Sequence, residues 1–253
     1  MSNTARERLD IVIPVYNEGA NIVPTLRAIA RDVKTPGRVL ICYDLDEDDT
    51  LPAITGNREA FGTLAIEFVR NRKRGAHAAV LTGFARSDAP FVLVFPADDD
   101  YNAGIVDSMV AEAAKGCDIV CASRFMAGGS MVGCPWLKDV LVRSANFTLH
   151  NLARLPTHDA SNGFRLFSRR IIDEITIESD RGFCYSIELL VKAHRMGWTI
   201  GEVPVRWIER QHGASRFRVL KWLPAYLHWY CYAFATTFLR RPPDTVALKE
   251  RGT

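Results

Sequence analysis

Hydrophobic and polar positions along the first half of the chain follow a pattern typical of strands that alternate with helices. Short apolar runs rich in Val, Ile and Leu predict buried strands at residues 9–15, 38–43, 64–69, 91–95 and 118–122. Between them, apolar residues recur every three or four positions, which predicts helices over residues 20–33, 75–85 and 105–114. This order predicts an α/β fold with a doubly wound, mainly parallel sheet and flanking helices.

Polar side chains follow four of these strands at the point where the apolar run stops. The carboxyl ends of parallel strands meet at one edge of a sheet, where ligands of such folds bind. We therefore expect these side chains to line one crevice. They are Tyr16, Asn17 and Glu18 after the first strand, residues 44–49 after the second, Asp98, Asp99 and Asp100 after the fourth, and Ser123 and Arg124 after the fifth.

Three consecutive carboxylates, Asp98, Asp99 and Asp100, follow the apolar run of residues 91–95. Negative charges this close repel one another, so a bound cation is the simplest compensation. The i, i+2 spacing of Asp98 and Asp100 suits two carboxylates that reach one Mg²⁺ or Mn²⁺ ion. The alternative is a solvated loop that caps the following helix.

Composition and charge narrow the class of protein. A chain of 253 residues that is 48% hydrophobic and 24% charged suits one globular domain with an ample core. A net charge of +3 is too balanced for a protein that coats nucleic acid. No strand is followed by a GxGxxG or Walker lysine motif, which argues against a dinucleotide oxidoreductase and a P-loop NTPase. The acidic strand ends favour a nucleotide diphosphate bound through a metal.

The N-terminus and the cysteines indicate a compartment. Residues 1–8 form a short polar tail without an apolar secretion signal, so we expect a cytoplasmic protein. The six cysteines contain no CxxC pair, and several lie within apolar runs. This predicts reduced core thiols rather than disulfides or zinc ligands.

In sequence order, the motifs of this chain resemble those of family 2 glycosyltransferases, which have the GT-A fold, and specifically of the dolichol-phosphate mannosyltransferase branch. The resemblance extends from Ile11 to about Arg216. A single match of this kind is weak, whereas eight in order are specific. The matches are residues 13–18; Asp44, Asp48 and Thr50; residues 75–79 and Gly83; Ala97 and Asp98; residues 122–125, 128 and 129; residues 159–165; Glu188; and residues 202–204 with Arg210, Gly213, Ser215 and Arg216.

The resemblance implies a donor site for a nucleotide-diphosphate sugar. Asp44 would accept hydrogen bonds from the N–H edge of uracil or guanine. The metal would act as a Lewis acid that neutralises charge on the departing diphosphate. The residues implied on this side are Pro14, Tyr16 and Glu18 as the wall, Asp44 at the base, Asp98 and Asp100 at the metal, and Arg210 and Arg216 on a loop that closes over the diphosphate.

Several donor-side assignments have alternatives. Glu18 is also suited to the positive end of a helix, and Asp48 is also suited to a turn. His212 fits a solvated loop better than a catalytic role. The family usually has Asp-Ala-Asp where this chain has Pro96 before Ala97 and Asp98, so the metal must rest on Asp98 with Asp100 or Asp99, or bind less tightly.

The resemblance also implies an acceptor site for a polyprenyl phosphate. Arg124 matches the arginine that holds the acceptor phosphate, and Arg143, with Lys138 nearby, lies close to the expected second one. Guanidinium groups bind phosphate in a bidentate manner and would position it for in-line attack. A phosphate oxyanion needs no catalytic base. A hydroxyl acceptor would need one, and the candidates are residues 98–100 and Asp159. Arg143 is equally compatible with a solvated helix position.

Residues 222–239 form an aromatic segment without Asp, Glu, Lys or Arg. Its length is marginal for a transmembrane span, and its Tyr and Trp content favours a helix in the lipid headgroup region. The alternative is a core or oligomer-interface helix. We expect a polar tail (1–8), a catalytic domain (9–216), a membrane-contact helix (217–241) and a polar C-terminal tail (242–253).

The predicted function is inverting transfer of a hexose from a GDP- or UDP-linked donor to a polyprenyl phosphate, on the cytoplasmic face of a membrane. The residues expected to act in the reaction are Asp98, Asp100, Arg124 and Arg210. Two alternatives stay open: transfer to a hydroxyl of a glycan or lipid headgroup, and a non-catalytic membrane-associated subunit. Expected partners are the membrane surface and either a second copy of the chain or a membrane protein.

Overall fold

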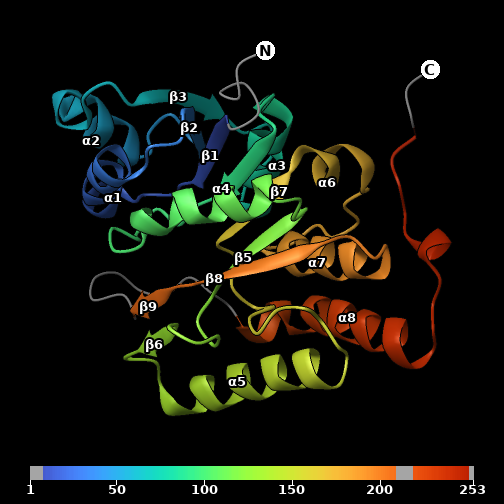
Figure 1. The fold of residues 1–253 in the computed structure, drawn as a ribbon. Coiled ribbons are helices and arrows are strands. Elements are labelled where there is room, and N and C mark those ends of the chain that lie inside the picture. The colour runs from blue at the N-terminus through green and yellow to red at the C-terminus, as the bar shows by residue number, and fades with distance from the viewer. Residues whose placement is uncertain (1–7, 209–218, 251–253) are drawn as a thin grey trace.

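A seven-stranded sheet runs through the centre of the molecule (Figure 1). The structure is a computed structural model that describes residues 8–208 and 219–250. The strand order is β3-β2-β1-β4-β7-β5-β8. The strands are β1 (Leu9–Pro14), β2 (Gly37–Tyr43), β3 (Ala65–Arg70), β4 (Phe91–Val94), β5 (Ile119–Ser123), β7 (Arg165–Ser168) and β8 (Ile200–Pro204).

The five predicted strands are confirmed, each within one or two residues of its predicted start and end. Neighbouring strands in the group β1 to β4 pair in parallel, as do β5 and β8. The sequence pattern did not predict β7, which lies antiparallel between β4 and β5. The carboxyl ends of β1, β2, β4 and β5 therefore meet at one edge of the sheet, where the start of β7 also lies.

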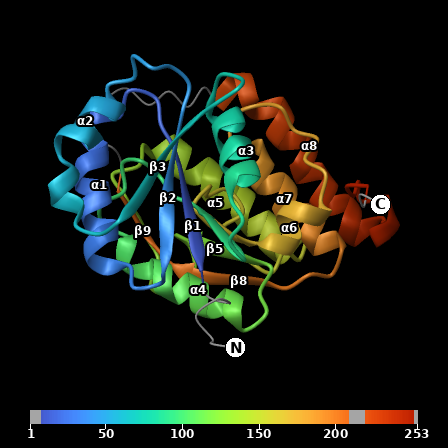
Figure 2. The same cartoon turned by 90° about the horizontal axis from the view of Figure 1, so that it is seen from above.

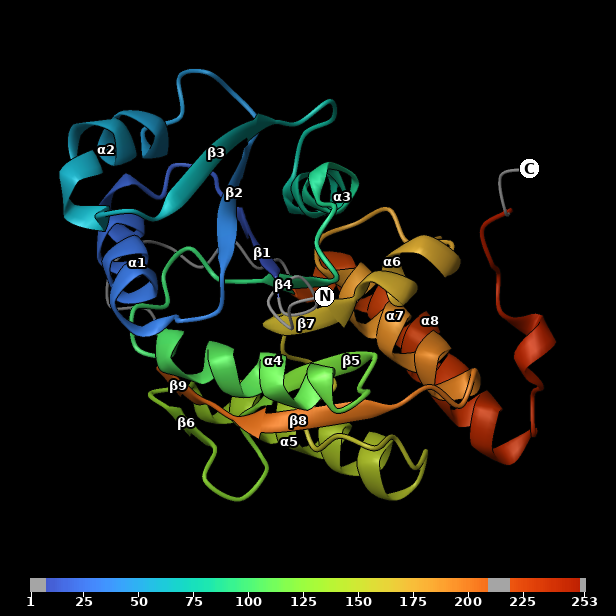
Figure 3. The same cartoon turned by 45° about the horizontal axis from the view of Figure 1, so that its top comes forward.

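Helices cover both faces of the sheet (Figure 3). One face packs against α1 (Gly19–Asp32), α2 (Thr50–Gly56) and α4 (Val106–Ala114), which follows a 3-10 turn at Ala103–Ile105. The other face packs against α3 (Ala76–Arg86), α6 (Arg169–Glu174) and α7 (Cys184–Arg195). Two further 3-10 turns are Arg58–Phe61 and Pro243–Thr245. The predicted doubly wound arrangement is confirmed.

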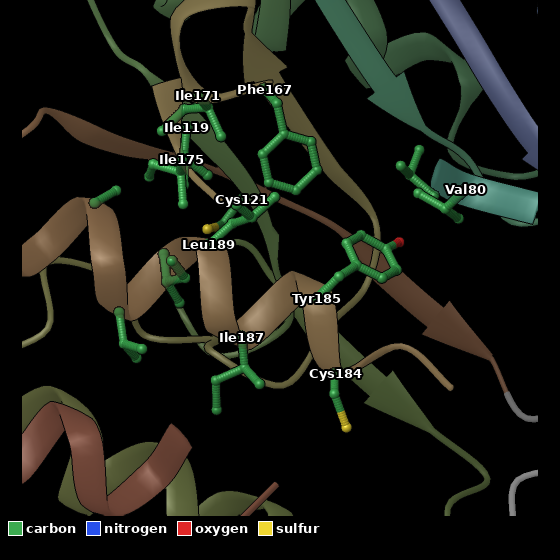
Figure 4. Packing of buried hydrophobic residues seen from close by; sticks show 14 of the residues in the cluster. Val80, Ile119, Cys121, Phe167, Ile171, Ile175, Cys184, Tyr185, Ile187 and Leu189 are labelled. Atoms are coloured by element: carbon green, nitrogen blue, oxygen red, sulfur yellow. The ribbon is translucent and has the colours of Figure 1, made fainter. Parts of the chain in front are cut away.

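Alternating side chains of the strands fill two separate cores. In β1, Ile11 and Ile13 face α1, whereas Val12 faces α3 and α7. Figure 4 shows the second core, where Phe167 and Tyr185 lie among aliphatic side chains. All six cysteines are free thiols, as predicted, although Cys231 is exposed rather than in the core.

The second half of the chain adds a small layer beside the sheet. Strand β6 (Ser130–Val132) pairs in parallel with β9 (Arg206–Ile208), and α5 (Trp136–Asn151) follows β6. Figures 1 and 2 show α8 (Val219–Phe238) lying along α7. Figure 1 also shows α5 beside α8.

One face of α8 belongs to the core. Trp229 and Ala233 are buried against α7, so the core-helix alternative holds for this face. The membrane role of the helix stays a prediction. Within the described residues, no helix has both the length and the hydrophobicity to cross a membrane.

Candidate functional site

The loops that follow β1 and β2 are held together by carboxylates and backbone amides. The amide of Asn17 donates to both carboxylate oxygens of Asp48, each at 3.1 Å, and the amide of Glu18 donates to Thr50 Oγ1 at 3.0 Å. Asn17 adopts a left-handed backbone conformation with φ of 52°. Asp48 is buried and also accepts the amide of Thr50. The turn alternative for Asp48 is therefore what the structure shows.

The predicted wall of the donor site lies at the N-terminus of α1. Pro14 ends β1, and Tyr16 is about half exposed beyond it. Glu18 precedes the helix and accepts a hydrogen bond from Asn21 Nδ2 at 2.8 Å. Its carboxylate thus lies where the helix dipole favours negative charge, as the alternative reading proposed. The donor roles of Pro14, Tyr16 and Glu18 stay predictions.

Asp44 links the ends of β2 and β3 to the start of α3. Its Oδ1 accepts from Asn71 Nδ2 at 2.9 Å, and its Oδ2 accepts from the amide of Gly75 at 2.8 Å. Gly75 has φ of 102°, a conformation that side chains rarely tolerate. The half-buried carboxylate is thus fixed in orientation, and its role toward a nucleotide base stays a prediction.

The three aspartates after β4 divide into two kinds. Asp99 turns back and accepts from the amides of Tyr101 and Asn102, at 3.1 and 3.0 Å, and from Asn102 Nδ2. Burial raises its pKa, although these hydrogen bonds partly offset that effect. Asp99 therefore shapes the loop and precedes the 3-10 turn, as the capping alternative proposed for the group.

Asp98 and Asp100 flank Asp99 and are both half-buried. Within the described part of the chain, no donor or cation contacts the Asp100 carboxylate. No three His, Cys, Asp or Glu side chains among residues 8–208 and 219–250 converge as a metal cage. Two hard carboxylate ligands still fit Mg²⁺ or Mn²⁺ if phosphate oxygens complete the coordination, as is usual for Mg²⁺. The metal assignment of Asp98 and Asp100 stays a prediction.

Asn102 connects this acidic loop to β9. Its Nδ2 donates to the carbonyl of Arg206 at 2.8 Å, and its Oδ1 accepts the amide of Arg206 at 3.2 Å. The side-chain amide thus pairs with the backbone as a neighbouring strand would. Sequence analysis missed this residue, although an Asx residue three positions after Asp99 is a signal of local capping.

Arg124, at the end of β5, forms a buried ion pair with Asp159. Its Nε and Nη2 donate to the two carboxylate oxygens at 2.7 and 2.9 Å, and its amide donates at 3.1 Å. Burial raises the pKa of Asp159, but Arg124 and then Arg165 outweigh burial and hold that pKa below its ordinary value. Arg165 is fully buried and donates to the carbonyl of Asp159. One carboxylate here compensates two guanidinium groups.

The predicted acceptor residues gather around two aromatic rings. The guanidinium groups of Arg124 and Arg143 each lie 5.1 Å from the Phe125 ring centre. Lys138 Nζ lies 4.9 Å from the ring of Trp207. Arg143 is half exposed. Asp139 orients its side chain through a 2.8 Å ion pair. Arg124 and Arg143 thus share one aromatic neighbour, and their role in holding an acceptor phosphate stays a prediction.

Ser161 links Arg124 to α5 through hydrogen bonds. Its Oγ accepts from Arg124 Nη2 at 2.7 Å and from Asn146 Nδ2 at 2.9 Å. Sequence analysis missed Phe125 and Asn146 as site residues. Asn146 was detectable as a polar residue on the otherwise apolar inner face of α5, whereas Phe125 belonged to the matched motif at residues 122–125 but had no role assigned to it.

The other candidate site residues have structural partners or lie outside the described residues. Glu188 is fully buried, pairs with Lys192 at 2.7 Å and accepts the amides of Glu178 and Ser179. The buried carboxylate of Glu188 therefore has structural partners within the described residues. Arg210, His212 and Arg216 lie outside the described residues.

The chain is similar in sequence to a known family and to curated proteins. The model of a family described as "Glycosyl transferase family 2" matches residues 10–176. The polyprenol monophosphomannose synthase of Mycolicibacterium smegmatis is 26% identical over 242 residues, covering 85% of this chain and 87% of the relative. An uncharacterized glycosyltransferase of Mycobacterium bovis is 28% identical over 212 residues, covering 84% and 90%.

Solved structures share the fold. Glucosyl-3-phosphoglycerate synthase of Mycobacterium tuberculosis, in complex with Mn²⁺, UDP and glucosyl-3-phosphoglycerate, superposes with a TM-score of 0.63 at 17% identity. The match covers 91% of this chain and 79% of that chain. A second complex of that synthase, with Mn²⁺, UDP-glucose and phosphoglyceric acid, gives a TM-score of 0.65 at 16% identity and covers 96% and 86%. The predicted GT-A type of α/β fold is confirmed.

Proposed function

Because the chain belongs to the family 2 glycosyltransferases, we propose that it transfers a hexose, with inversion, from a nucleotide-diphosphate sugar to a polyprenyl phosphate. The observation that carries this proposal is the placement of two unlike groups at one edge of the sheet. Carboxylates follow β4, whereas Arg124 follows β5 and is joined at the Phe125 ring by Arg143 of α5. The first group suits a metal-bound diphosphate, and the second suits a phosphate anion.

The similarity to the polyprenol monophosphomannose synthase supports the acceptor class, because it extends over most of both chains. On the donor side, Asp44 is the residue that would read the N–H edge of a base. Its two hydrogen bonds from Asn71 and Gly75 hold the carboxylate in one orientation. Uracil and guanine both present such an edge, so GDP- and UDP-linked sugars are both in the proposed donor class.

Asp98 and Asp100 would hold the Mg²⁺ or Mn²⁺ ion. When bound, the ion neutralises negative charge on the departing nucleoside diphosphate. The hydrogen bonds within the loop keep Asp99 out of this role and fix the backbone between the two ligands. Pro96 replaces the first aspartate of the family motif, so this chain would hold the ion with fewer carboxylates than its relatives.

Arg143 and Arg124 would hold the acceptor phosphate. Arg143 is half exposed and its only ion pair within the described chain is with Asp139, which a phosphate dianion can displace. Arg124 is nearly buried, and its Nε and Nη2 are held by Asp159 and Ser161, so Nη1, 3.7 Å from Met131 Sδ, is the nitrogen that would reach the phosphate. A bound phosphate oxyanion is itself the nucleophile, and no side chain needs to remove a proton. We propose that the reaction takes place at the cytoplasmic face of a membrane, where such acceptors reside.

The test compares three acceptors with purified protein, a labelled GDP- or UDP-sugar, and Mg²⁺ or Mn²⁺. The acceptors are a short-chain polyprenyl phosphate, the matching polyprenol without phosphate, and 3-phosphoglycerate. The proposal expects an acid-labile glycolipid from the polyprenyl phosphate alone, and loss of that product when EDTA removes the metal. Product only from the polyprenol or from 3-phosphoglycerate would instead establish a hydroxyl acceptor. Nucleotide binding without product from any acceptor would favour the non-catalytic alternative.

A further inference from the structure

Helix α5 exposes a broad apolar face. The exposed fractions of Trp136, Leu141 and Phe147 are 76%, 59% and 65%. Spacings of three, four and seven residues place the exposed apolar positions on one side of the helix. Those positions are Trp136, Leu137, Val140, Leu141, Phe147 and Leu152 just beyond the helix end. A surface helix of a soluble domain normally presents polar residues there, so this face indicates an interaction surface.

The inward face of α5 is already occupied. Leu149 and Asn146 are buried, and Asn146 donates to Ser161 and accepts the amide of Ala160. Thr148 Oγ1 lies 2.6 Å from the hydroxyl of Tyr230 on α8. The exposed apolar residues therefore do not belong to the face by which α5 packs on the rest of the protein. Turning the helix inward would break these contacts.

The charges around this face are positive on balance. Arg143 is exposed and pairs with Asp139, which is half-buried on the same helix, and Arg154 is exposed just after the helix. Thr237 on α8 donates to the carbonyl of Ala153 at 2.6 Å, which fixes the C-terminal ends of the two helices together. Arg240 and Arg241, both exposed, directly follow that end of α8. The rim of the apolar face is thus complementary to an anionic surface.

Helix α8, which lies beside α5, also exposes apolar side chains. Leu227, Phe238 and Leu239 are exposed, and an apolar groove of about 370 Å³ lies along the helix. The groove is lined by Tyr230, Cys231, Phe234, Ala235, Phe238 and Leu239. Figure 1 shows α5 and α8 next to each other at the side of the molecule away from α1 and α2.

We propose that α5 docks this protein on the surface of an anionic phospholipid bilayer. Helix α5 lies in the headgroup region, with Trp136, Leu141 and Phe147 facing the acyl chains and the arginines facing lipid phosphates. This proposal deepens and rests on the proposed function, since a polyprenyl acceptor is itself part of a bilayer. It makes α5 the principal membrane contact, because Trp229 and Ala233 on the inner face of α8 belong to the core.

The position of Arg143 fits this occupant. It lies on α5 next to the exposed apolar positions, and its guanidinium group stacks on Phe125 together with Arg124. A docked α5 thus brings the acceptor site to the depth of lipid phosphates. A second copy of the chain is a poorer occupant, because a twofold interface would bring the same arginines of both copies together.

The experiment measures binding to vesicles by co-sedimentation, with phosphatidylcholine alone and with added phosphatidylglycerol. The variants are Leu137→Glu with Leu141→Glu, and separately Phe147→Ser. The matched control is Phe68→Ser, which removes an exposed phenylalanine from β3. We expect the α5 variants to weaken binding to anionic vesicles about tenfold or more, and the control to leave it unchanged. Wild-type binding should also fall with salt and without phosphatidylglycerol.

Thermal unfolding of each variant checks that it is folded, and Phe147→Ser serves if the double variant is not. Wild-type-like vesicle binding by a folded α5 variant overturns the proposal. So does an α5-dependent dimer in a protein that does not bind vesicles. An assay of hexose transfer to a water-soluble short-chain polyprenyl phosphate tests the proposed function without a membrane. Both α5 variants should transfer hexose in this assay at the wild-type rate. Absence of that transfer in wild type refutes the proposed function, while an α5-dependent vesicle signal still supports the docking surface.

Discussion

Replacing Asp159 by asparagine tests the buried charge arrangement around Arg124. Asp159 is fully buried, and its carboxylate accepts Nε, Nη2 and the amide of Arg124, together with the amide of Ser161. Asparagine keeps the size of the side chain but removes its charge and one acceptor. Arg124, with 9% of its side chain exposed, and the fully buried Arg165 would then share no carboxylate.

Breaking a buried ion pair by removing one partner lowers stability by about 3–5 kcal/mol, because the remaining charge stays buried without compensation. For a chain of this size that corresponds to a fall in Tm of roughly 10 °C. Urea and thermal unfolding of Asp159→Asn measure both quantities. The matched control is Asp139→Asn, whose pair with Arg143 is half exposed and should contribute less than about 0.5 kcal/mol. An Asp159→Asn protein within about 1 kcal/mol of wild type would refute the reasoning.

The pH dependence of this loss has a definite sign. The folded pKa of Asp159 is lower than that of an unfolded aspartate, about 3.9. Its contribution is therefore fully present above the unfolded pKa and disappears as pH falls through the folded pKa. The stability difference between wild type and Asp159→Asn should stay constant from about pH 5 to pH 8 and shrink below about pH 4. A difference that grows on acidification would contradict the assignment.

Three further predictions concern the two binding sides and the core. Asp98→Asn or Asp100→Asn should raise the metal concentration needed for half-maximal transfer by about tenfold or more, and a rate that depends on Mn²⁺ as in wild type would remove that residue from the metal site. Arg143→Gln should raise the KM for polyprenyl phosphate about tenfold and leave the KM for the donor unchanged, in steady-state assays with each substrate varied; a rise only in the donor KM would reverse our assignment of the sides. Lys192→Met should lower the free energy of unfolding by about 3–5 kcal/mol because Glu188 stays buried without its cation, and a loss under about 1 kcal/mol would mean that the amides bound to Glu188 are sufficient.

The sequence pattern predicted the strands of the regular first half, and it missed β7 and β8, whose apolar runs are short or interrupted. Strand β7 has only four residues and begins with Arg165, which a pattern-based analysis treats as exposed although it is fully buried. Strand β8 contains Gly201 and Glu202, which break the apolar run. Both strands lie beyond the regular alternation that carried the prediction for the first half.

Within the site, the sequence predicted which loops meet but not how each carboxylate is used. Their shared edge followed from parallel strand order alone. Asp48 accepts a hydrogen bond from the amide of Asn17, and Asp159 accepts one from Arg124. In both cases the partner lies about thirty positions away in the sequence. A linear pattern contains no signal for such pairings, so it cannot separate an aspartate that builds a loop from one that is open to a ligand.

Two hydrogen bonds between the Asn102 side chain and the backbone of Arg206 join the acidic loop to β9. The same side chain also donates to Asp99, in the middle of the acidic loop. Arg206 lies four positions before Arg210 in the sequence. A shift of the acidic loop would therefore pull directly on β9, the strand that precedes the predicted donor residue Arg210 in the sequence.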